Sequence, residues 1–258
     1  MINPILEESA HLYIRRNEYA ILHLAYLGAL ALVTVVAWPS RGFMEFFRLD
    51  TVPAVFEVVA IFELLALSGI GLMAGQDRLA PSQIIRYSEW LERTDLPVRT
   101  LLVGKLTAAL VHTAILVIIG TPFLIVSAGP AGIPLRAAFA SQWIVFVAAL
   151  FCRIFGLFLS HIGEERYVIR VIGAWVFLAI LYLITIGSMQ SLNPIIALVR
   201  QHSETSQLVT SLDTVPFLQN PALLPTAYLF VGLAMTTAAY GLGLRHHRTR
   251  AQRRETVE

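Results

Sequence analysis

The chain has 258 residues, of which 57% are apolar and 14% are charged, and its mean hydropathy is +0.69. Soluble domains carry about 25% charged residues, so this composition excludes an ordinary soluble domain and indicates an integral membrane protein. A single cysteine, Cys152, excludes a disulfide framework within one chain, and a net charge of +2 gives no reason to expect a nucleic-acid partner.

The first predicted element is a helix on the membrane surface, within residues 1–18. Asn3 and Pro4 are a good helix start, because asparagine caps the first turn and proline fits its first position. The following residues place Leu6 and Ile14 on one face and charged side chains on the other. Such an amphipathic helix lies in the membrane interface rather than crossing it.

Six apolar segments predict an all-α protein with six transmembrane helices in a single domain. A helix that crosses about 30 Å of hydrocarbon needs roughly 20 apolar residues. Segments that meet or approach this length are 19–38, 52–74, 106–126, 137–160, 171–189 and 223–244. We expect the first to be retained as an anchor, because Glu7, Glu8 and Glu18 stand where a cleaved signal peptide would be basic.

The positions of basic residues predict that both termini are cytoplasmic. Basic residues in short loops stay on the cytoplasmic side. With the N-terminus inside, that side collects Arg15 and Arg16 of the N-terminal segment, the arginines of the 76–100 loop, of the 161–170 loop and of the basic tail 245–258, together with Lys105. The opposite side collects only Arg41, Arg48, Arg136 and Arg200.

Two long connections are each expected to contain a helix. In the cytoplasmic loop 76–100, Ile84, Tyr87 and Leu91 recur at helical spacing between Pro81 and Pro97, which predicts a short amphipathic helix. In the external loop 190–222, Asn193 followed by Pro194 predicts the start of a second short helix. We expect this helix to lie at the outer interface or to dip into it, as re-entrant segments do.

No enzyme signature is present in the sequence. Gly104-Lys105 resembles the end of a P-loop, but Arg99 replaces the first glycine and Leu106 the final Ser or Thr. We therefore expect no catalytic residues and no ATP hydrolysis by this chain alone. His23 and His112 lie within spans and suggest either two haem ligands or two histidines that hydrogen-bond between helices.

Ionisable residues within or beside the spans are the other candidate site. Such groups are costly in lipid, so each of them is a functional-site hypothesis. They are Glu57, Glu63, Lys105, His112 and Arg153. One interpretation is a structural ion pair between helices, most plausibly Glu63 with Arg153; the other is a polar substrate or ion route, with Glu63 as the carrier in proton-coupled transport.

The arrangement of these elements resembles the permease subunit of the ABC type-2 exporter family. That family has an N-terminal surface helix, six spans, a cytoplasmic coupling helix after span two and a longer external loop after span five. Segment 89–98, which reads Glu-Trp-Leu-Glu-Arg-Thr-Asp-Leu-Pro-Val, and the Leu-rich run that ends in Gly104-Lys105 are similar to the family's coupling region. The family's acidic-Gly-Thr lead-in is replaced here by residues 84–87, Ile-Ile-Arg-Tyr.

The resemblance implies partners as well as a fold. Two permease chains, identical or different, would form the membrane half of an exporter in a bacterial or archaeal cytoplasmic membrane, and a separate ATPase subunit would bind the ATP. No cofactor is then expected in this chain. Residues implied to contact the ATPase are Arg86, Tyr87, Glu89, Trp90, Leu91 and Glu92. The second and fifth spans would meet the other permease through Ala66, Gly69, Gly173 and Gly187.

Two other classes of protein remain open from the sequence. A self-sufficient secondary transporter or channel would be expected to contain internal repeats and broken helices at the midplane. A non-transporting membrane subunit, such as a haem carrier or a scaffold in a larger complex, is the other alternative. Copurification of an ATPase, of no partner or of a coloured cofactor distinguishes the three.

Overall fold

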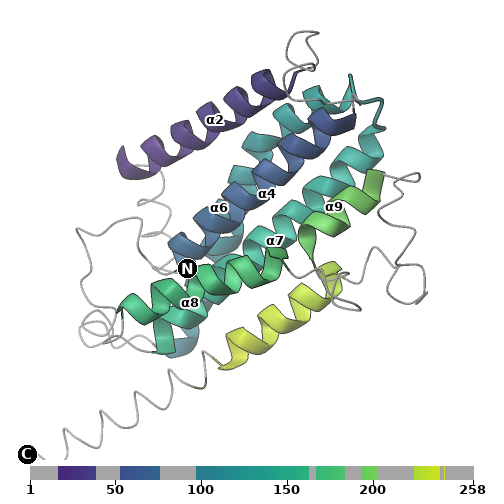
Figure 1. Cartoon of the computed structure of the whole chain (residues 1–258). Coiled ribbons are helices and arrows are strands. Elements are labelled where there is room, and N and C mark those ends of the chain that lie inside the picture. The colour runs from purple at the N-terminus through teal and green to yellow at the C-terminus, as the bar shows by residue number, and fades with distance from the viewer. Residues whose placement is uncertain are drawn as a thin grey trace, which may run out of the picture.

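The computed structural model describes residues 17–38, 53–75, 97–162, 167–183, 193–202, 224–238 and 241. Within these ranges the chain forms helices joined by turns and contains no strand (Figure 1). The expected surface helix before residue 17, most of the cytoplasmic loop and the basic tail lie outside them.

Four of the helices are long and apolar enough to cross a membrane. They are α2 (Asn17–Ala37), α4 (Pro53–Gly75), α6 (Val98–Ala128) and α7 (Leu135–Ile162). The first, second and fourth agree closely with the predicted spans. The chain is thus a helical membrane protein, as its composition indicates.

The fifth and sixth predicted spans correspond to shorter apolar helices. They are α8 (Tyr167–Leu183), whose apolar part is Ile172–Leu183, and a C-terminal helix, Leu224–Ala238. Residues 184–189 and most of 239–244, which would complete these spans, lie outside the described part of the chain. The described residues thus contain four helices that could span a membrane, and six spans remain a prediction.

Helix α6 begins eight residues before the predicted third span. Pro97 precedes it with an extended backbone, φ −65° and ψ 137°, and proline at a helix start removes no hydrogen bond that the helix needs. At 1.5 Å per residue, its 31 residues extend about 46 Å, more than the hydrocarbon thickness. Arg99 and Lys105 consequently lie on the helix itself rather than in a loop.

A tight turn makes α6 and α7 antiparallel neighbours. Gly132 adopts a positive φ of 67°, which glycine reaches without the clash that a side chain would cause. The amide of Ile133 then donates to the carbonyl of Ala128 at 3.0 Å, which satisfies an acceptor at the end of α6.

Glycines allow α4 and α7 to approach backbone to backbone. A methyl group on Gly75 would collide with the carbonyl oxygen of Arg153, and one on Gly156 would collide with that of Leu72. Gly71 has the carbonyl oxygen of Ala149 2.7 Å from the place of a Cβ. Gly71 and Gly75 form a G-x-x-x-G pattern, which in membranes favours close helix contact.

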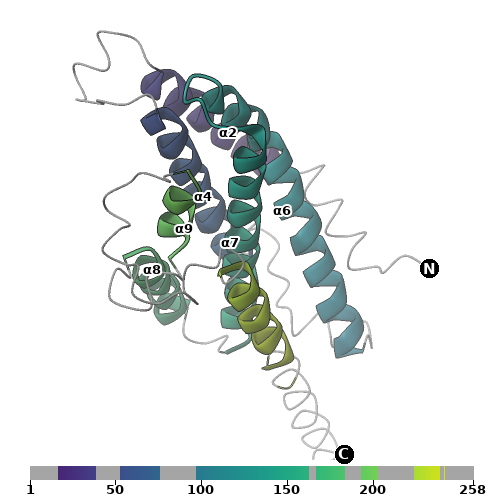
Figure 2. The same cartoon turned by 90° about the vertical axis from the view of Figure 1, so that its right-hand side faces the viewer.

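Helix α7 is the centre of the described bundle, and α2 lies at its edge. Figure 2 shows α6 on one side of α7 and α8 and α9 on the other. Helix α2 packs against α4 and α6 and leaves Ile21, Leu24, Leu32 and Val35 exposed, as a lipid-facing helix would. The helices α8 and Leu224–Ala238 pack on α7 through aromatic rings. Phe177 stacks on Phe155 with 3.8 Å between the ring centroids, and Tyr228 stacks on Phe151 with 4.6 Å between them.

Helix α9 (Pro194–His202) packs into the bundle against α4 and α7, and its Leu198 is buried in the common core. Asn193 caps it as predicted, because its Oδ1 accepts a hydrogen bond from the amide of Ile195 at 2.9 Å. The Nδ2 of Asn193 donates to the carbonyl of Tyr182 in α8 at 2.8 Å. The start of α9 is therefore buried beside α8, while its predicted position at the outer interface of the membrane remains a prediction.

Candidate intramembrane polar site

The carboxyl group of Glu63 is the centre of a polar cluster between α2, α4, α6 and α7. Its Oε1 accepts hydrogen bonds from the hydroxyl of Tyr26 at 3.4 Å and from Nε2 of Gln142 at 2.7 Å. The same Nε2 donates to the carbonyl oxygen of Val117 in α6 at 2.8 Å. Glu63 has 0% of its surface exposed, so the cluster is closed to solvent and lipid.

Gly120 makes room for this carboxyl group. A Cβ at Gly120 would collide with Glu63 Oε1, and it would lie 2.5 Å from the hydroxyl of Tyr26. Only glycine therefore allows α6 to pass so close to the two polar groups. Tyr26, Gln142 and Gly120 were not predicted as site residues from the sequence, although a glutamine in the apolar run 137–160 is a signal of the same kind as an intramembrane charge.

Two side-chain atoms of this cluster lack a hydrogen-bond partner. Among the described residues, the buried side-chain nitrogen and oxygen atoms without a hydrogen-bond partner are Glu63 Oε2 and Gln142 Oε1. Buried polar groups are nearly always hydrogen-bonded, so two unpartnered atoms on neighbouring side chains require an explanation.

A second polar cluster joins α2, α6 and α7 through His112. Nε2 of His112 lies 3.1 Å from Nε2 of His23, and Nδ1 of His112 contacts the guanidinium of Arg153. Arginine only donates hydrogen bonds, so Nδ1 of His112 must accept, and in a neutral ring its Nε2 then carries the proton and donates to His23. His112 and Arg153 are only 1% and 2% exposed, whereas His23, at the edge of the cluster, is partly exposed.

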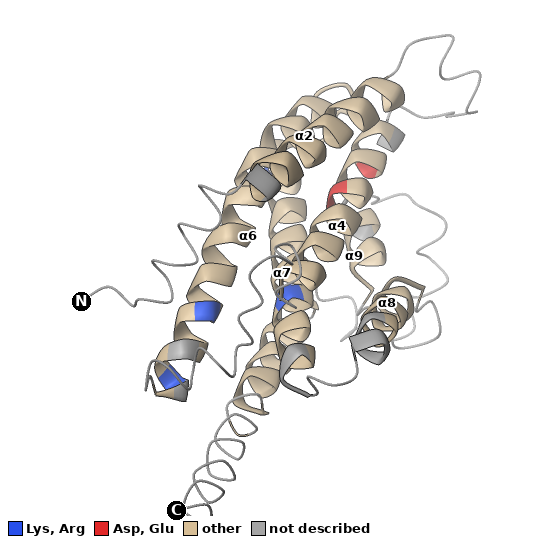
Figure 3. Ribbon diagram, turned by 90° about the vertical axis from the view of Figure 1, so that its left-hand side faces the viewer, with Lys and Arg blue, Asp and Glu red and all other residues tan. Residues whose placement is uncertain are grey.

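The expected ion pair between Glu63 and Arg153 is not formed. Gly71, eight residues after Glu63 on α4, faces Arg153. A Cβ atom added to Gly71 would lie 3.5 Å from the Cβ of Arg153. Eight helical residues correspond to about 12 Å along the axis, which is too far for a salt bridge. In Figure 3 the red residues of α4 lie apart from the blue residues that are visible on the other helices.

The distance between His23 and His112 is that of a direct hydrogen bond rather than that of two ligands on opposite sides of one metal ion. One metal ion bonded linearly to two imidazole nitrogens at about 2.0 Å each would hold them about 4 Å apart. His23 and His112 instead make a direct contact at 3.1 Å, as expected for histidines that hydrogen-bond between helices. Within the described ranges, no three His, Cys, Asp or Glu residues come together to hold a metal ion.

A third cluster ties the start of α9 to α4 and α8. The hydroxyl groups of Ser68 and Tyr182 are hydrogen-bonded, and Asn193 donates to the backbone of Tyr182. Cys152 is buried beside them as a free thiol, in agreement with the absence of a disulfide framework. These contacts hold α9 against the bundle.

The remaining predicted site residues lie apart from these clusters or outside the described chain. Glu57 is partly exposed on α4, and Lys105 is partly exposed on α6. The residues implied to contact an ATPase, Arg86 to Glu92, lie outside the described residues, so their role remains a prediction.

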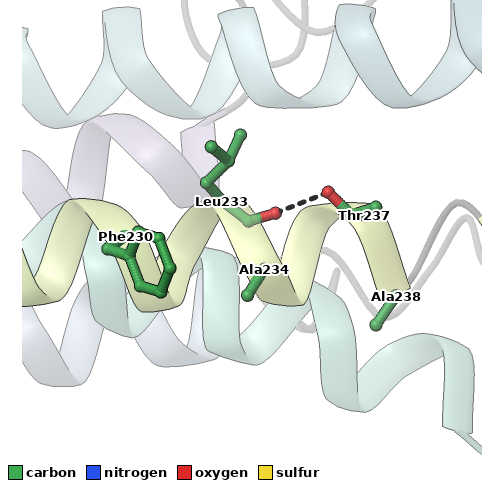
Figure 4. A pocket seen from close by; sticks show the side chains of 5 residues that line it. All are labelled: Phe230, Leu233, Ala234, Thr237 and Ala238. Carbon is green, nitrogen blue, oxygen red and sulfur yellow. Dashed lines mark hydrogen bonds between the residues drawn. The ribbon is translucent and has the colours of Figure 1, made fainter.

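The C-terminal helix carries an open apolar depression rather than a polar site. It is lined by Phe230, Leu233, Ala234, Thr237 and Ala238 (Figure 4). The hydroxyl of Thr237, its one polar side-chain group, donates to the carbonyl of Leu233 at 2.9 Å within the same helix. This apolar surface is suited to contact with lipid, and its lining residues present no unpaired polar side-chain group.

The sequence was compared with protein-family models and with curated proteins, and neither comparison gives a match.

Proposed function

We propose that this chain is the membrane-spanning permease subunit of an ATP-binding-cassette exporter of the type-2 class, which moves its substrate with energy from ATP hydrolysed by a separate subunit. The proposal rests on the family resemblance of the sequence. The geometry of the described bundle supports it in two respects, which concern the buried polar clusters and the helices α4 and α8.

The enclosure of the polar clusters is the observation that carries the proposal. Glu63, His112 and Arg153 join helices to one another, and each of them is at most 2% exposed. Side chains used in this way stabilise the bundle and do not line a route through it. A permease that exports along an interface between two chains needs such a closed bundle, whereas a secondary transporter binds its substrate within its own bundle.

Open space beside two glycines agrees with an interface between two permeases. No atom lies within 4 Å of the place of a Cβ at Gly69 on α4 or at Gly173 on α8, the helices that the resemblance assigns to that contact. Small residues allow close approach of helices in membranes. Ala66 instead packs against the chain's own core, and Gly187 lies outside the described residues.

The resemblance implies a longer external loop after the fifth span, and α9 belongs to this part of the chain. The ATP would bind on the partner subunit, which would dock on the cytoplasmic helix within 76–100. Tyr87, Trp90 and Leu91 would be its anchors, since aromatic and large side chains dominate such contacts, and Arg86, Glu89 and Glu92 would lie at the rim.

The experiment compares Trp90→Ala with the unchanged chain after purification from the membranes of its own host. We expect a copurified polypeptide that is labelled by a photoreactive ATP analogue, and we expect Trp90→Ala to lose this polypeptide and ATP-driven transport while keeping its membrane insertion. Trp143→Ala is the matched control, because Trp143 is 52% exposed on α7 and contacts Phe146 of the same helix.

A purified chain that transports or conducts in vesicles without any ATP-binding partner would contradict the proposal. That result would favour the self-sufficient secondary transporter or channel. Equal retention of the ATP-binding polypeptide by Trp90→Ala and Trp143→Ala would contradict the assignment of the coupling helix.

A further inference from the structure

Glu63 and Gln142 are joined by one hydrogen bond, and each also has an unpartnered oxygen. Nε2 of Gln142 donates to Glu63 Oε1 at 2.7 Å, while Glu63 Oε2 and Gln142 Oε1 have no partner. Both unpartnered atoms are acceptors if the carboxyl group is ionised. An ionised Glu63 would thus leave two buried acceptors without a donor.

Rotating the amide of Gln142 by half a turn does not remove this problem. Its Nε2 lies against two acceptors, Glu63 Oε1 and the carbonyl oxygen of Val117 at 2.8 Å. A reversed amide would turn its oxygen toward that carbonyl, where no hydrogen atom is available. The orientation of Gln142 is therefore set by its two acceptors, and its Oε1 is available to a donor.

Among the described residues, no positively charged side chain contacts Glu63. The groups that face its carboxyl are the hydroxyl of Tyr26 from α2, Gly120 from α6 and the amide of Gln142 from α7. Glu57, on α4 itself, is another acid. Arg153 lies about 12 Å farther along the axis of α4, beside His112. A lone charge in this closed space would be unfavourable.

We propose that Glu63 is a proton-binding site, in which the carboxyl group is neutral and its Oε2–H donates to Gln142 Oε1. One proton then satisfies both unpartnered atoms and removes the uncompensated charge. The acid and the amide form a cyclic pair with two hydrogen bonds, and the second forms by a small rotation of groups that the first already aligns. The proton is resident in a closed site, so this inference is independent of the proposed ATP-driven transport.

Infrared spectroscopy of the purified full chain at neutral pH tests this proposal. Glu63→Gln is expected to lose a carboxylic-acid C=O band and to unfold at the same temperature as the unchanged protein, because an amide replaces the neutral acid with the same shape and hydrogen bonds. Glu57→Gln, on the same helix, is the matched control and is expected to keep the band.

A second variant keeps the proposal testable if Glu63→Gln does not fold. In Gln142→Leu the acid band is expected to remain and to move to higher frequency, because the acid loses both hydrogen bonds to the amide. A Glu63→Gln spectrum that loses only carboxylate bands, or an acid band that does not move in Gln142→Leu, would overturn the proposal.

Discussion

At the scale of single residues, the polar side chains of the bundle are arranged in separate clusters rather than one charged network. The carboxyl group of Glu63 has hydroxyl and amide partners, and Arg153 has an imidazole partner. Each hydrogen bond of this kind between helices in lipid stabilises the bundle by about 1 kcal/mol. Replacing either residue should therefore affect its own cluster and leave the other unchanged.

This separation predicts additive energies for Glu63 and Arg153. The change in unfolding free energy of the double variant Glu63→Gln/Arg153→Gln is expected to equal the sum of the changes in the two single variants, within about 0.5 kcal/mol. His112→Leu with Arg153→Gln is the matched comparison, and its coupling energy should reach about 0.5 to 3 kcal/mol because these side chains touch. Unfolding in mixed micelles measures both cycles, and a strong coupling between Glu63 and Arg153 would contradict the arrangement.

The close contact at Gly120 gives a second prediction at this scale. Gly120→Ala should destabilise the protein by about 1 to 3 kcal/mol, since its methyl group would collide with Glu63 and crowd Tyr26. In Gly28→Ala the methyl group meets open space on α2, so this control should be neutral or gain up to about 1 kcal/mol from helix propensity. The measurement is thermal unfolding in detergent, and equal behaviour of the two variants would show that α6 does not pass so close to Glu63.

At the scale of helices, the crossing of α4 and α7 decides how tightly the bundle is packed. Backbone oxygen atoms of each helix lie against glycines of the other at Gly71, Gly75 and Gly156. Without a strong hydrophobic force between helices in lipid, such close packing is a main source of association. The stability of the bundle should therefore depend on keeping glycine at the crossing of α4 and α7.

A methyl group at this crossing should separate the two helices. Gly75→Ala is expected to cost about 1 to 3 kcal/mol of unfolding free energy, because the carbonyl of Arg153 occupies the space that the methyl needs. Gly69→Ala, six residues earlier on the same helix, has open space and should leave the folding of the monomer unchanged. A Gly75→Ala variant as stable as Gly69→Ala would show that α4 and α7 are farther apart.

At the scale of the whole molecule, the predicted orientation in the membrane rests on the unequal distribution of basic residues. Most arginines belong to segments that the predicted topology assigns to the cytoplasmic side. The described helices agree with this alternation as far as they extend, since the tight turn at Gly132 makes α6 and α7 antiparallel.

Reporter fusions test the predicted topology directly. A reporter that is active only in the cytoplasm should work after Glu92 or Glu258 and fail after Ser203. A second reporter that is active only outside the cytoplasm serves as the control and should give the opposite pattern. Cytoplasmic activity at Ser203 would mean that an even number of spans precedes it, instead of the five predicted.

The sequence by itself was sufficient for the class of protein, the positions of four spanning helices and the cap of α9. These properties depend on local features: the length of an apolar run, the fixed backbone of Pro97 and the capping oxygen of Asn193. It also indicated that Glu63, His112 and Arg153 are important, because ionisable residues in apolar segments are conspicuous without any knowledge of their neighbours.

Only the tertiary structure decided which of these residues meet. Pairing depends on the depth of each side chain along its helix and on how the helices are offset, and a sequence states neither. The offset between α4 and α7 puts Gly71 opposite Arg153, and so Glu63 meets Gln142 and Tyr26 instead of the predicted arginine. The close contacts at Gly71 and Gly75 were not predicted from the sequence, because a small residue allows close approach without specifying which helix approaches.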